Sequence, residues 1–504
     1  MLFRATLRGS TLAYIALCSS VAFAQAPAAA PSATAAVSPA AEPPQGEASK
    51  TLEETLRVMM IGGGLTSDTV VARALQNSNE IKAKQQAIDA ADWGLSQAKA
   101  AYYPQLMLSA RYTRYSHINP VIFGAGTVVT THTPTTGERP IPAGEQLYAV
   151  NSPGFGFPIF ENSYSLSATL NIPLSDYVLR VSNAAGAAGA AKSATELEEK
   201  STRAAVALDA RVAYYQWIRA QGTQIVATGA LAQSQGHLSD TQNAFAAGLV
   251  SKADVLRAQS QEKSAELFLE RSRGNVELSA EKLRSLMQDF STPRFEVGEN
   301  IIADLPPGNW PNFDAAYSEA IAQRPELQSL RQMERSAHDQ ASLARKADLP
   351  RLDAQAGAQY ANPNPRYLPP EDKFHGTWDV GVVLSWTPTN IFGAEAGAHV
   401  AEANAAEFAA QQSALKEALR LEIAHDLQAV KEEEFALTAT AEGLTAAEEG
   451  YRVRRELFRI GRATLVEVTD AENELTRARL ESVNAHIDYR IARAQLAHAL
   501  GRKP

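Results

Sequence analysis

The chain has 504 residues, of which 45% are hydrophobic and 20% are charged, an ordinary globular balance. Its formal net charge of −9 argues against a nucleic-acid partner, because such partners usually face a basic surface. The single cysteine, Cys18, lies near the N-terminus, so disulfides and cysteine-ligated metals are excluded from the rest of the chain.

The N-terminus has the pattern of an export signal. Arg4 and Arg8 precede an apolar stretch from Thr11 to Phe23, and Ala24 completes a small-x-small cleavage site. We therefore expect residues 1–24 to be a signal peptide. Residues 25–55 are rich in Ala and Pro with few large apolar groups, which predicts a disordered spacer. No later stretch has 18 consecutive apolar residues, so any membrane crossing must use β-strands.

The rest of the chain repeats itself. Residues 74–81 return as residues 320–327, and the register then holds without a gap as far as Pro104 and Pro350. A second echo pairs residues 245–255 with residues 458–468. Each copy is expected to run helix, strand, loop, strand, long helix, tight turn, long helix. We therefore predict two structural repeats, 56–290 and 312–504, joined by a linker at 291–311.

Four segments alternate apolar and polar side chains with the period of a β-strand: 105–116, 163–174, 351–361 and 377–387. Their length, about 9 to 12 residues, suits a tilted strand that crosses a bilayer, and Tyr and Trp gather toward their ends. A half-buried sheet in a soluble sandwich is the alternative. If the strands cross a membrane, the lipid-facing side chains would be Leu166, Leu170, Trp378, Val382 and Trp386.

Four strands are too few to close a barrel, since single-chain bacterial barrels begin at about eight strands. The strands must then be pooled between copies of the chain, and three copies would supply twelve. The loop at 117–162 is long and rich in Gly, Pro and Thr, whereas the loop at 362–375 is short and Pro-rich. Long loops on one side match the outward face of such barrels.

Two long helices are predicted, at 180–246 and 394–457, because both stretches are Ala-rich and free of proline. Each could extend about 100 Å. An apolar stripe in the second, from Leu415 to Val430, indicates coiled-coil packing, and the Ala content permits close approach of neighbouring helices in a curved wall. An ordinary antiparallel coiled coil without a tunnel is the alternative.

Both long helices end at the repeated turn. Gly248 and Gly461 supply the left-handed conformation that closes a helix. Ser251 then offers an N-cap with Asp254 as its capping-box partner, and Thr464 and Glu467 repeat the arrangement. This local role explains the two acids without any further function.

The turn pattern, aromatic-x-x-Gly-x-x-Ser/Thr-x-x-Asp/Glu-Val, occurs twice and resembles the TolC family of outer-membrane efflux channels. The duplicated opening Ala-Leu-x-x-Asn-x-x-Ile/Leu, with its later Pro-x-Leu before a strand, resembles the same family, over roughly residues 66–290 and 312–501. The resemblance implies a mixed fold, mainly α with a β-barrel. It implies a duplicated protomer of long periplasmic helices and four transmembrane strands. Three such protomers would form a 12-stranded barrel and an α-helical barrel.

The resemblance also implies a role and partners. The expected location is the Gram-negative outer membrane, with an extension into the periplasm. The homotrimer would act as a passive exit duct that docks a periplasmic adaptor and is served by an inner-membrane RND, ABC or MFS pump. The docking tips would comprise Gly248, Leu249, Ser251, Gly461, Arg462 and Thr464.

The periplasmic entrance is the second site that the resemblance implies. Glu467 and Asp470 match acids that ring the entrance, and Asp254 matches part of the closing polar network. Phe458 departs from the pattern, because some relatives have a tyrosine there whose hydroxyl could bond to Asp254. On a threefold axis the two ring acids would give six carboxylates that attract cations. Solvated charge on an exposed helix is the alternative reading.

Catalytic signatures are not found in the sequence. It has no phosphate-binding loop, nucleophile elbow or His-Glu-x-x-His pattern. Glu422-x-x-His425 occurs once, whereas a di-iron bundle needs two copies and further carboxylates. We expect no enzyme activity, metal or cofactor. The alternative to a channel is a soluble periplasmic helical scaffold or adaptor that binds other envelope proteins, and a protein-export channel would share the channel architecture.

Overall fold

The computed structural model describes residues 64–119, 122–130, 148–156, 158–301, 305 and 310–502. All of them belong to one compact unit, Lys50–Pro504. The predicted signal peptide at 1–24 and the predicted spacer at 25–55 lie outside the described residues. Within the described part of the chain, no helix combines the length and the apolar character that a membrane crossing requires.

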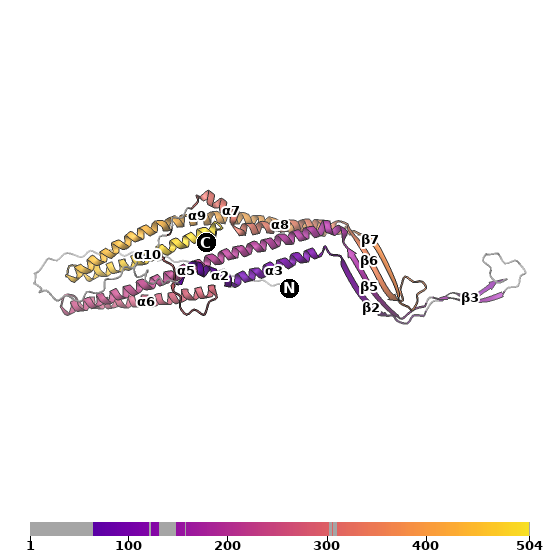
Figure 1. Cartoon of the computed structure of the whole chain (residues 1–504), viewed down its shortest axis with the longest axis horizontal. Helices are drawn as coiled ribbons and strands as arrows, with labels where there is room; N and C mark the ends of the chain where they lie inside the picture. The colour runs from indigo at the N-terminus through magenta and orange to yellow at the C-terminus, as the bar shows by residue number, and fades with distance from the viewer. Residues whose placement is uncertain are drawn as a thin grey trace, which may run out of the picture. The chain divides into compact units, whose positions relative to one another are not determined.

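The first repeat begins with two helices rather than one. The Ser78 side chain caps the N-terminus of the second helix by accepting a hydrogen bond from the Ile81 N–H. A strand pair and a helical hairpin follow (Figure 1). In order, the elements are α2 Ser67–Asn77, α3 Asn79–Ala100, β2 Gln105–Arg114, β3 Ile122–Thr130, β4 Tyr148–Gly156, β5 Asn162–Ile172, α4 Leu174–Asp176, the π-helix η1 Tyr177–Val181, α5 Ser182–Ala246 and α6 Lys252–Met287.

The second repeat has the same order. Here Pro325 at the first position of a helix separates the two opening helices. Its elements are α7 Phe313–Gln323, α8 Pro325–Arg345, the 3₁₀ helix η2 Lys346–Asp348, β6 Arg351–Asn362, β7 His375–Ser385, α9 Asn390–Arg459 and α10 Leu465–Ala499. One difference between the halves is the hairpin β3–β4, which the first repeat carries inside the stretch expected to be a loop.

Four strands form one antiparallel sheet in the order β2-β5-β6-β7, so that β5 and β6 join the two repeats. The register aligns side chains of one kind across the sheet. Leu108, Ala168, Ala358 and Trp378 lie in one row, and the next row along the strands, Ser109, Ser167, Gln359 and Thr377, is polar. Because successive side chains point to opposite faces, this register produces one apolar and one polar face.

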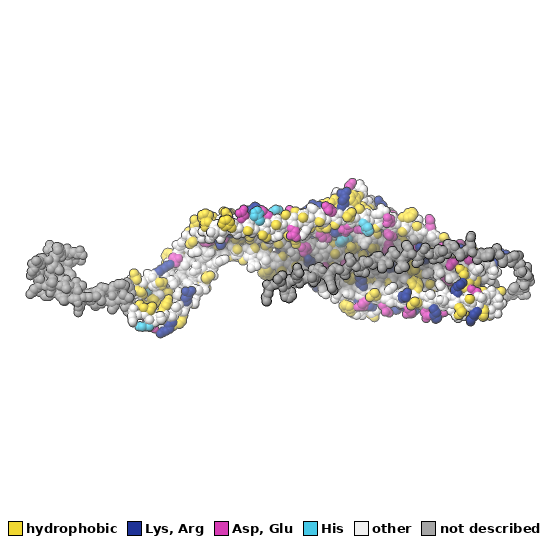
Figure 2. Space-filling view, turned by 180° about the vertical axis from the view of Figure 1, so that it is seen from behind, with side chains coloured by type: hydrophobic (Ala, Val, Ile, Leu, Met, Phe, Trp, Pro, Cys, Tyr) yellow, Lys and Arg dark blue, Asp and Glu magenta, His cyan; other side chains and the backbone are white. Residues whose placement is uncertain are grey.

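The helices pack as two long hairpins, α5 with α6 and α9 with α10, and the short helices α3 and α8 extend them toward the strands (Figure 1). Helix α5 also packs against α3, α8 and α10. Its buried face is rich in alanine, including Ala187, Ala190, Ala194, Ala207, Ala210 and Ala213. Small side chains let the helix axes approach closely. Charged side chains are scattered over the helical surface that Figure 2 shows.

The segment between the repeats is part of the core rather than a free connection. Phe295, Val297 and Ile301 are buried in the main hydrophobic cluster. Leu65 and Val297 form a parallel β-bridge, and next to it the backbones of Gly64 and Gly298 approach so closely that a Cβ on Gly298 would lie 2.2 Å from the Gly64 carbonyl oxygen. The close approach requires glycine at both positions.

Candidate functional site

The two hairpin tips have the same local structure. At the first tip Gly248 has φ +74°, its N–H donates to the Phe245 carbonyl at 2.9 Å, and the Leu249 N–H donates to the Ala244 carbonyl at 2.9 Å. At the second tip Gly461 has φ +71°, and the corresponding bonds are 2.9 and 2.7 Å long. Both are helix ends in which a left-handed glycine lets the chain satisfy the last free carbonyls.

The next helix begins in each case with a capping box. The Ser251 N–H and hydroxyl donate to the Asp254 carboxylate at 2.9 and 2.7 Å. The Thr464 N–H and hydroxyl donate to the Glu467 carboxylate at 2.6 and 2.9 Å. These hydrogen bonds stabilise the charged form and hold the pKa of both acids below the ordinary value. Asp254 and Glu467 are therefore structural caps, whatever further role they have.

A cleft of about 950 Å³ lies between the two tips. Seven of the predicted site residues line it: Gly248, Leu249, Ser251, Asp254, Phe458, Gly461 and Thr464. Arg462, Glu467 and Asp470 are not among its lining residues; all three are exposed. The structure thus brings Asp254 together with the residues predicted to form the docking tips, except Arg462, and places the predicted ring acids outside that cleft.

Polar residues that the sequence reasoning missed also line the cleft: Asp240, Asn243 and Arg459. They precede the tip glycines by no more than about two helical turns, and their position near the turn is the only sequence signal that could have found them.

The aromatic residue of the second tip contacts the first hairpin. The Phe458 ring lies 5.6 Å from the His237 ring on α5, measured between centroids. Asp254 takes its hydrogen bonds from Ser251 instead, so Phe458 acts as an apolar contact rather than as a polar latch. Farther along, the Gln261 side chain donates to the Asn473 side chain at 3.1 Å and ties α6 to α10.

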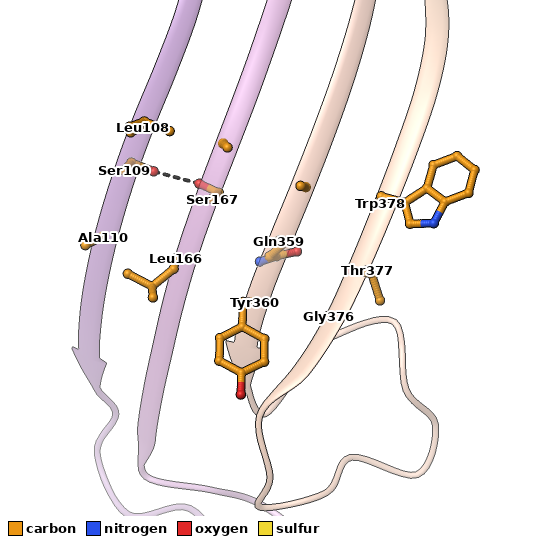
Figure 3. A pocket seen from close by; sticks show the side chains of 12 residues that line it. Leu108, Ser109, Ala110, Leu166, Ser167, Gln359, Tyr360, Gly376, Thr377 and Trp378 are labelled. Carbon is orange, nitrogen blue, oxygen red and sulfur yellow. Dashed lines mark hydrogen bonds between the residues drawn. The ribbon is translucent and has the colours of Figure 1, made fainter.

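Four of the predicted lipid-facing residues, Leu166, Leu170, Trp378 and Val382, lie on one face of the sheet. Leu166, Trp378 and Val382 are exposed in the single protomer, at 53%, 76% and 65%, while Leu170 is half-buried. Trp386 follows β7 and donates from its ring nitrogen to the Asp348 carbonyl at 2.9 Å. Figure 3 shows side chains from both faces of the sheet; on the polar face, Ser109 of β2 is hydrogen-bonded to Ser167 of β5 at 2.7 Å.

An ion-pair cluster fixes the junction of strands and helices. The buried Asp176 carboxylate, between β5 and α5, pairs with Arg180 and with Arg351 at the start of β6. Arg180 also donates to the Leu349 carbonyl at 2.6 Å. The cluster binds the first strand pair to the second where both leave the helices.

The isolated Glu422-x-x-His425 pair has other partners. The Glu422 carboxylate lies 3.5 Å from Arg324, and His425 lies 3.0 Å from Asp426. Within the described ranges, no three His, Cys, Asp or Glu side chains form a group that could hold a metal ion.

Solved structures of outer-membrane channels share this fold. CmeC from Campylobacter jejuni has a TM-score of 0.69 and 16% identity, with 92% of this chain and 94% of that chain covered. VceC from Vibrio cholerae has 0.68 and 18%, with 86% and 96% covered. The open state of MtrE from Neisseria gonorrhoeae has 0.67 and 15%, with 87% and 89% covered. The predicted fold class, a TolC-like duplicated protomer that is mainly α with a small sheet, is confirmed.

Among curated proteins, none matches the chain significantly in sequence. The sequence pattern of the outer membrane efflux protein family, in contrast, matches residues 70–287 and 316–502. This match confirms the predicted family, the outer-membrane efflux channel and its location, and does not favour the soluble scaffold. Because the matched residues are most of its length, the chain belongs to the outer membrane efflux protein family.

Proposed function

We propose that the protein is a passive exit duct whose three copies close a twelve-stranded barrel in the outer membrane. A periplasmic adaptor and an inner-membrane RND, ABC or MFS pump would drive solutes through it, and the duct itself would perform no chemistry. The observation that carries the proposal is the register of the sheet, which gathers apolar side chains on one face and leaves two strand edges open.

The open edges favour assembly with identical copies. In the described sheet, β2 and β7 each pair with one neighbour only. An exposed edge carries unpaired N–H and C=O groups, which no water would satisfy inside a bilayer. Pairing β7 of one copy with β2 of the next removes both edges, and three copies close the ring. The apolar face, with Leu108 and Trp378, would then contact lipid, and the row of Ser109 and Thr377 would face the lumen.

The tips support the adaptor contact. Leu249 is 78% exposed and Ile460 is 66% exposed, and Val466 at the rim of the cleft is also exposed. Large apolar side chains gathered at a surface cleft are typical of protein interaction sites. We therefore propose that the adaptor covers the tips and the cleft between them.

The barrel is tested with spin labels in lipid nanodiscs. Labels at Leu166 and Val382 should be accessible to oxygen and shielded from a hydrophilic nickel chelate, because oxygen concentrates in lipid. A label at Ser167, the neighbour of Leu166 on the opposite face, is the matched control and should show the reverse. Aqueous surroundings for Leu166 and Val382, or a monomer after mild detergent extraction, would rule out the duct.

The proposed entrance ring is tested by cation preference. Glu467→Gln with Asp470→Asn removes six charges from a trimer, while Gln keeps the capping hydrogen bonds that Glu467 makes. The reversal potential under a salt gradient should shift toward the value of a channel that does not discriminate between cations and anions. This shift should be largest at low ionic strength. Glu474→Gln, which removes an exposed charge from the same helix, is the control. A reversal potential that is equal in both variants and the parent would eliminate the ring.

A further inference from the structure

Helix α10 carries a buried acid in its packing seam near the tips. Leu465, Val468 and Leu475 are buried at the three- and four-residue spacing of a coiled-coil seam, and the position between them is Glu472, which is only 3% exposed. Such a position normally holds an apolar side chain. Within the described part of the chain, the Glu472 Oε2 atom has no hydrogen-bond partner.

Helix α5, which packs against α10, also carries a buried polar stretch toward its C-terminal end. Ser234, His237 and Thr241 are buried at the same kind of spacing. The His237 Nε2 atom, like the Glu472 oxygen, has no partner among the described residues. Two titratable side chains, on two of the helices that meet near the tips, are therefore buried without full hydrogen bonding, an arrangement that packing alone does not favour.

Charged and titratable groups from three helices lie at or next to Glu472. On α9, Arg455 and Tyr451 interact with Glu472 itself. Arg479 of α10 and Asp240 of α5 interact with Tyr451, and Arg455 also acts on His237 of α5. Arg479 is engaged with Glu448, at 3.8 Å. Burial raises the pKa of Glu472 to about 7, and the positive charge of Arg455 opposes this only in part.

We propose that Glu472 is a proton-binding site that couples periplasmic pH to the packing of α10 against α5 and α9 at the tips. The protonated carboxyl fits the buried seam, whereas the ionised carboxylate favours an arrangement in which α10 moves away and water reaches it. The proton site does not depend on the proposed duct function; only its effect on the channel entrance rests on that function.

The direction of the coupling follows from proton binding. In a hydrated arrangement the carboxyl ionises near its ordinary pKa of 4.5, and in the packed arrangement near 7. The packed arrangement therefore loses stability as pH rises from about 4.5 to about 7 and changes no further above that. The interval of roughly 2.5 pH units corresponds to a change of about 300-fold in the packing equilibrium.

His237 acts in the opposite direction. Burial lowers its pKa below the ordinary 6.5, so acid pH favours an arrangement in which the imidazole is charged and hydrated. The contribution of Glu472 must therefore be measured as the difference between the parent protein and a variant that lacks only the titratable carboxyl group. Glu472→Gln fits this purpose, because the amide has nearly the same shape and stays neutral.

Packing at the tips can be measured directly. Gln261 and Asn473 are hydrogen-bonded across α6 and α10, so cysteines at these positions place two spin labels close together. The one natural cysteine, Cys18, lies in the predicted signal peptide, so the labels are unique in the exported protein. Spin–spin coupling is recorded in the exported protein in nanodiscs from about pH 4 to about pH 8.5, a range that spans the proposed titration.

The coupling should weaken as pH rises from about 4.5 to about 7 in the parent protein and change little above that. This response should be lost in Glu472→Gln and kept in the control Glu474→Gln, whose side chain is exposed on the same helix. The variant His237→Gln should show a larger response than the parent, because the opposing group is gone. An identical pH response with and without Glu472, or no response of the parent in this range, would overturn the proposal.

Conductance separates this proposal from the proposed function. In planar bilayers the parent should open more at alkaline than at acid pH, and Glu472→Gln should lose that dependence. Labels that respond to pH through Glu472 in a protein that conducts no ions would support the proton site and refute the duct.

Discussion

Replacing Gly461 with alanine should destabilise the second tip, although the same replacement at Gly443 should stabilise the helix that leads to it. A Cβ at either position would touch nothing within 4 Å, so packing contributes to neither change. Gly461 has φ +71°, a left-handed conformation that costs an L-residue about 1–2 kcal/mol. Gly443 lies inside α9, where alanine is better than glycine by about 0.5–1 kcal/mol.

The assay is hydrogen exchange of the tip amides, because it measures local opening without unfolding the whole protein. The Gly461 and Arg462 N–H groups close the end of α9. A cost of about 1–2 kcal/mol should speed their exchange roughly 5- to 30-fold in Gly461→Ala. Gly461→Asn should change it less, because asparagine adopts the left-handed region more readily, and Gly461→Val should change it more.

The opposite signs make the reasoning refutable. Slower or unchanged exchange at the tip in Gly461→Ala would show that the left-handed glycine is not what closes α9. Faster exchange in Gly443→Ala would show that the effect of alanine comes from disturbance of the helical hairpin in general. Adaptor binding to Gly461→Val should weaken while the yield of trimer stays the same, since the strands are unaffected.

Three further predictions follow from local geometry. Gln288 has φ +53° at the end of α6, so Gln288→Gly should stabilise that end by about 1 kcal/mol, seen as slower amide exchange there. The pKa values of Asp254 and Glu467 are lowered, so the stability that these acids give to the tips is present above their ordinary pKa and should be lost as pH falls through the lowered values. Hydrogen exchange of the tip amides, corrected for intrinsic exchange rates, should show this loss. Asp176→Asn removes the buried partner of Arg180 at the strand–helix junction, should cost about 3 kcal/mol, and should lower the temperature at which the trimer dissociates in detergent.

The tips were predictable because their structure is local. Glycine at the helix end, Ser or Thr as the cap and an acid three residues later act within one turn of chain, so the pattern around Gly248 and Gly461 carries the geometry by itself. The alternation of the four strands is similarly local. Their register across β5 and β6 joins segments from different halves, and only the assembled sheet reveals it.

The hairpin β3–β4 was not expected, because the stretch was interpreted as a Gly-, Pro- and Thr-rich loop. Its strands pair through their backbones, with Val128 opposite Val150, and lack the regular alternation by which the other strands were recognised. The buried Glu472 was also missed. Its seam spacing from Leu465 to Leu475 is visible in the sequence, but burial of an acid depends on how three helices meet, which no local pattern encodes.

The segment between the repeats shows how tertiary packing changes the meaning of a connecting sequence. Read as a linker, residues 291–311 would be open to protease. In the structure Phe295 and Val297 are buried, and the close approach of Gly298 to Gly64 holds them in place. Trypsin should therefore cleave after the exposed Arg294 only slowly in the native protein.

Gly298→Ala should accelerate that cleavage strongly, because a Cβ there would collide with the Gly64 backbone and the bridge between Leu65 and Val297 would open. A cost of about 3 kcal/mol or more is expected for such a backbone clash, and cleavage through local opening would rise more than 100-fold. Gly236→Ala, at an open helical position, is the control and should leave the rate unchanged. Equal cleavage of the parent and Gly298→Ala would mean that the segment is a simple linker after all, and that the two repeats are held together by other contacts, among them the β5–β6 pairing and the packing of α5 against α8 and α10.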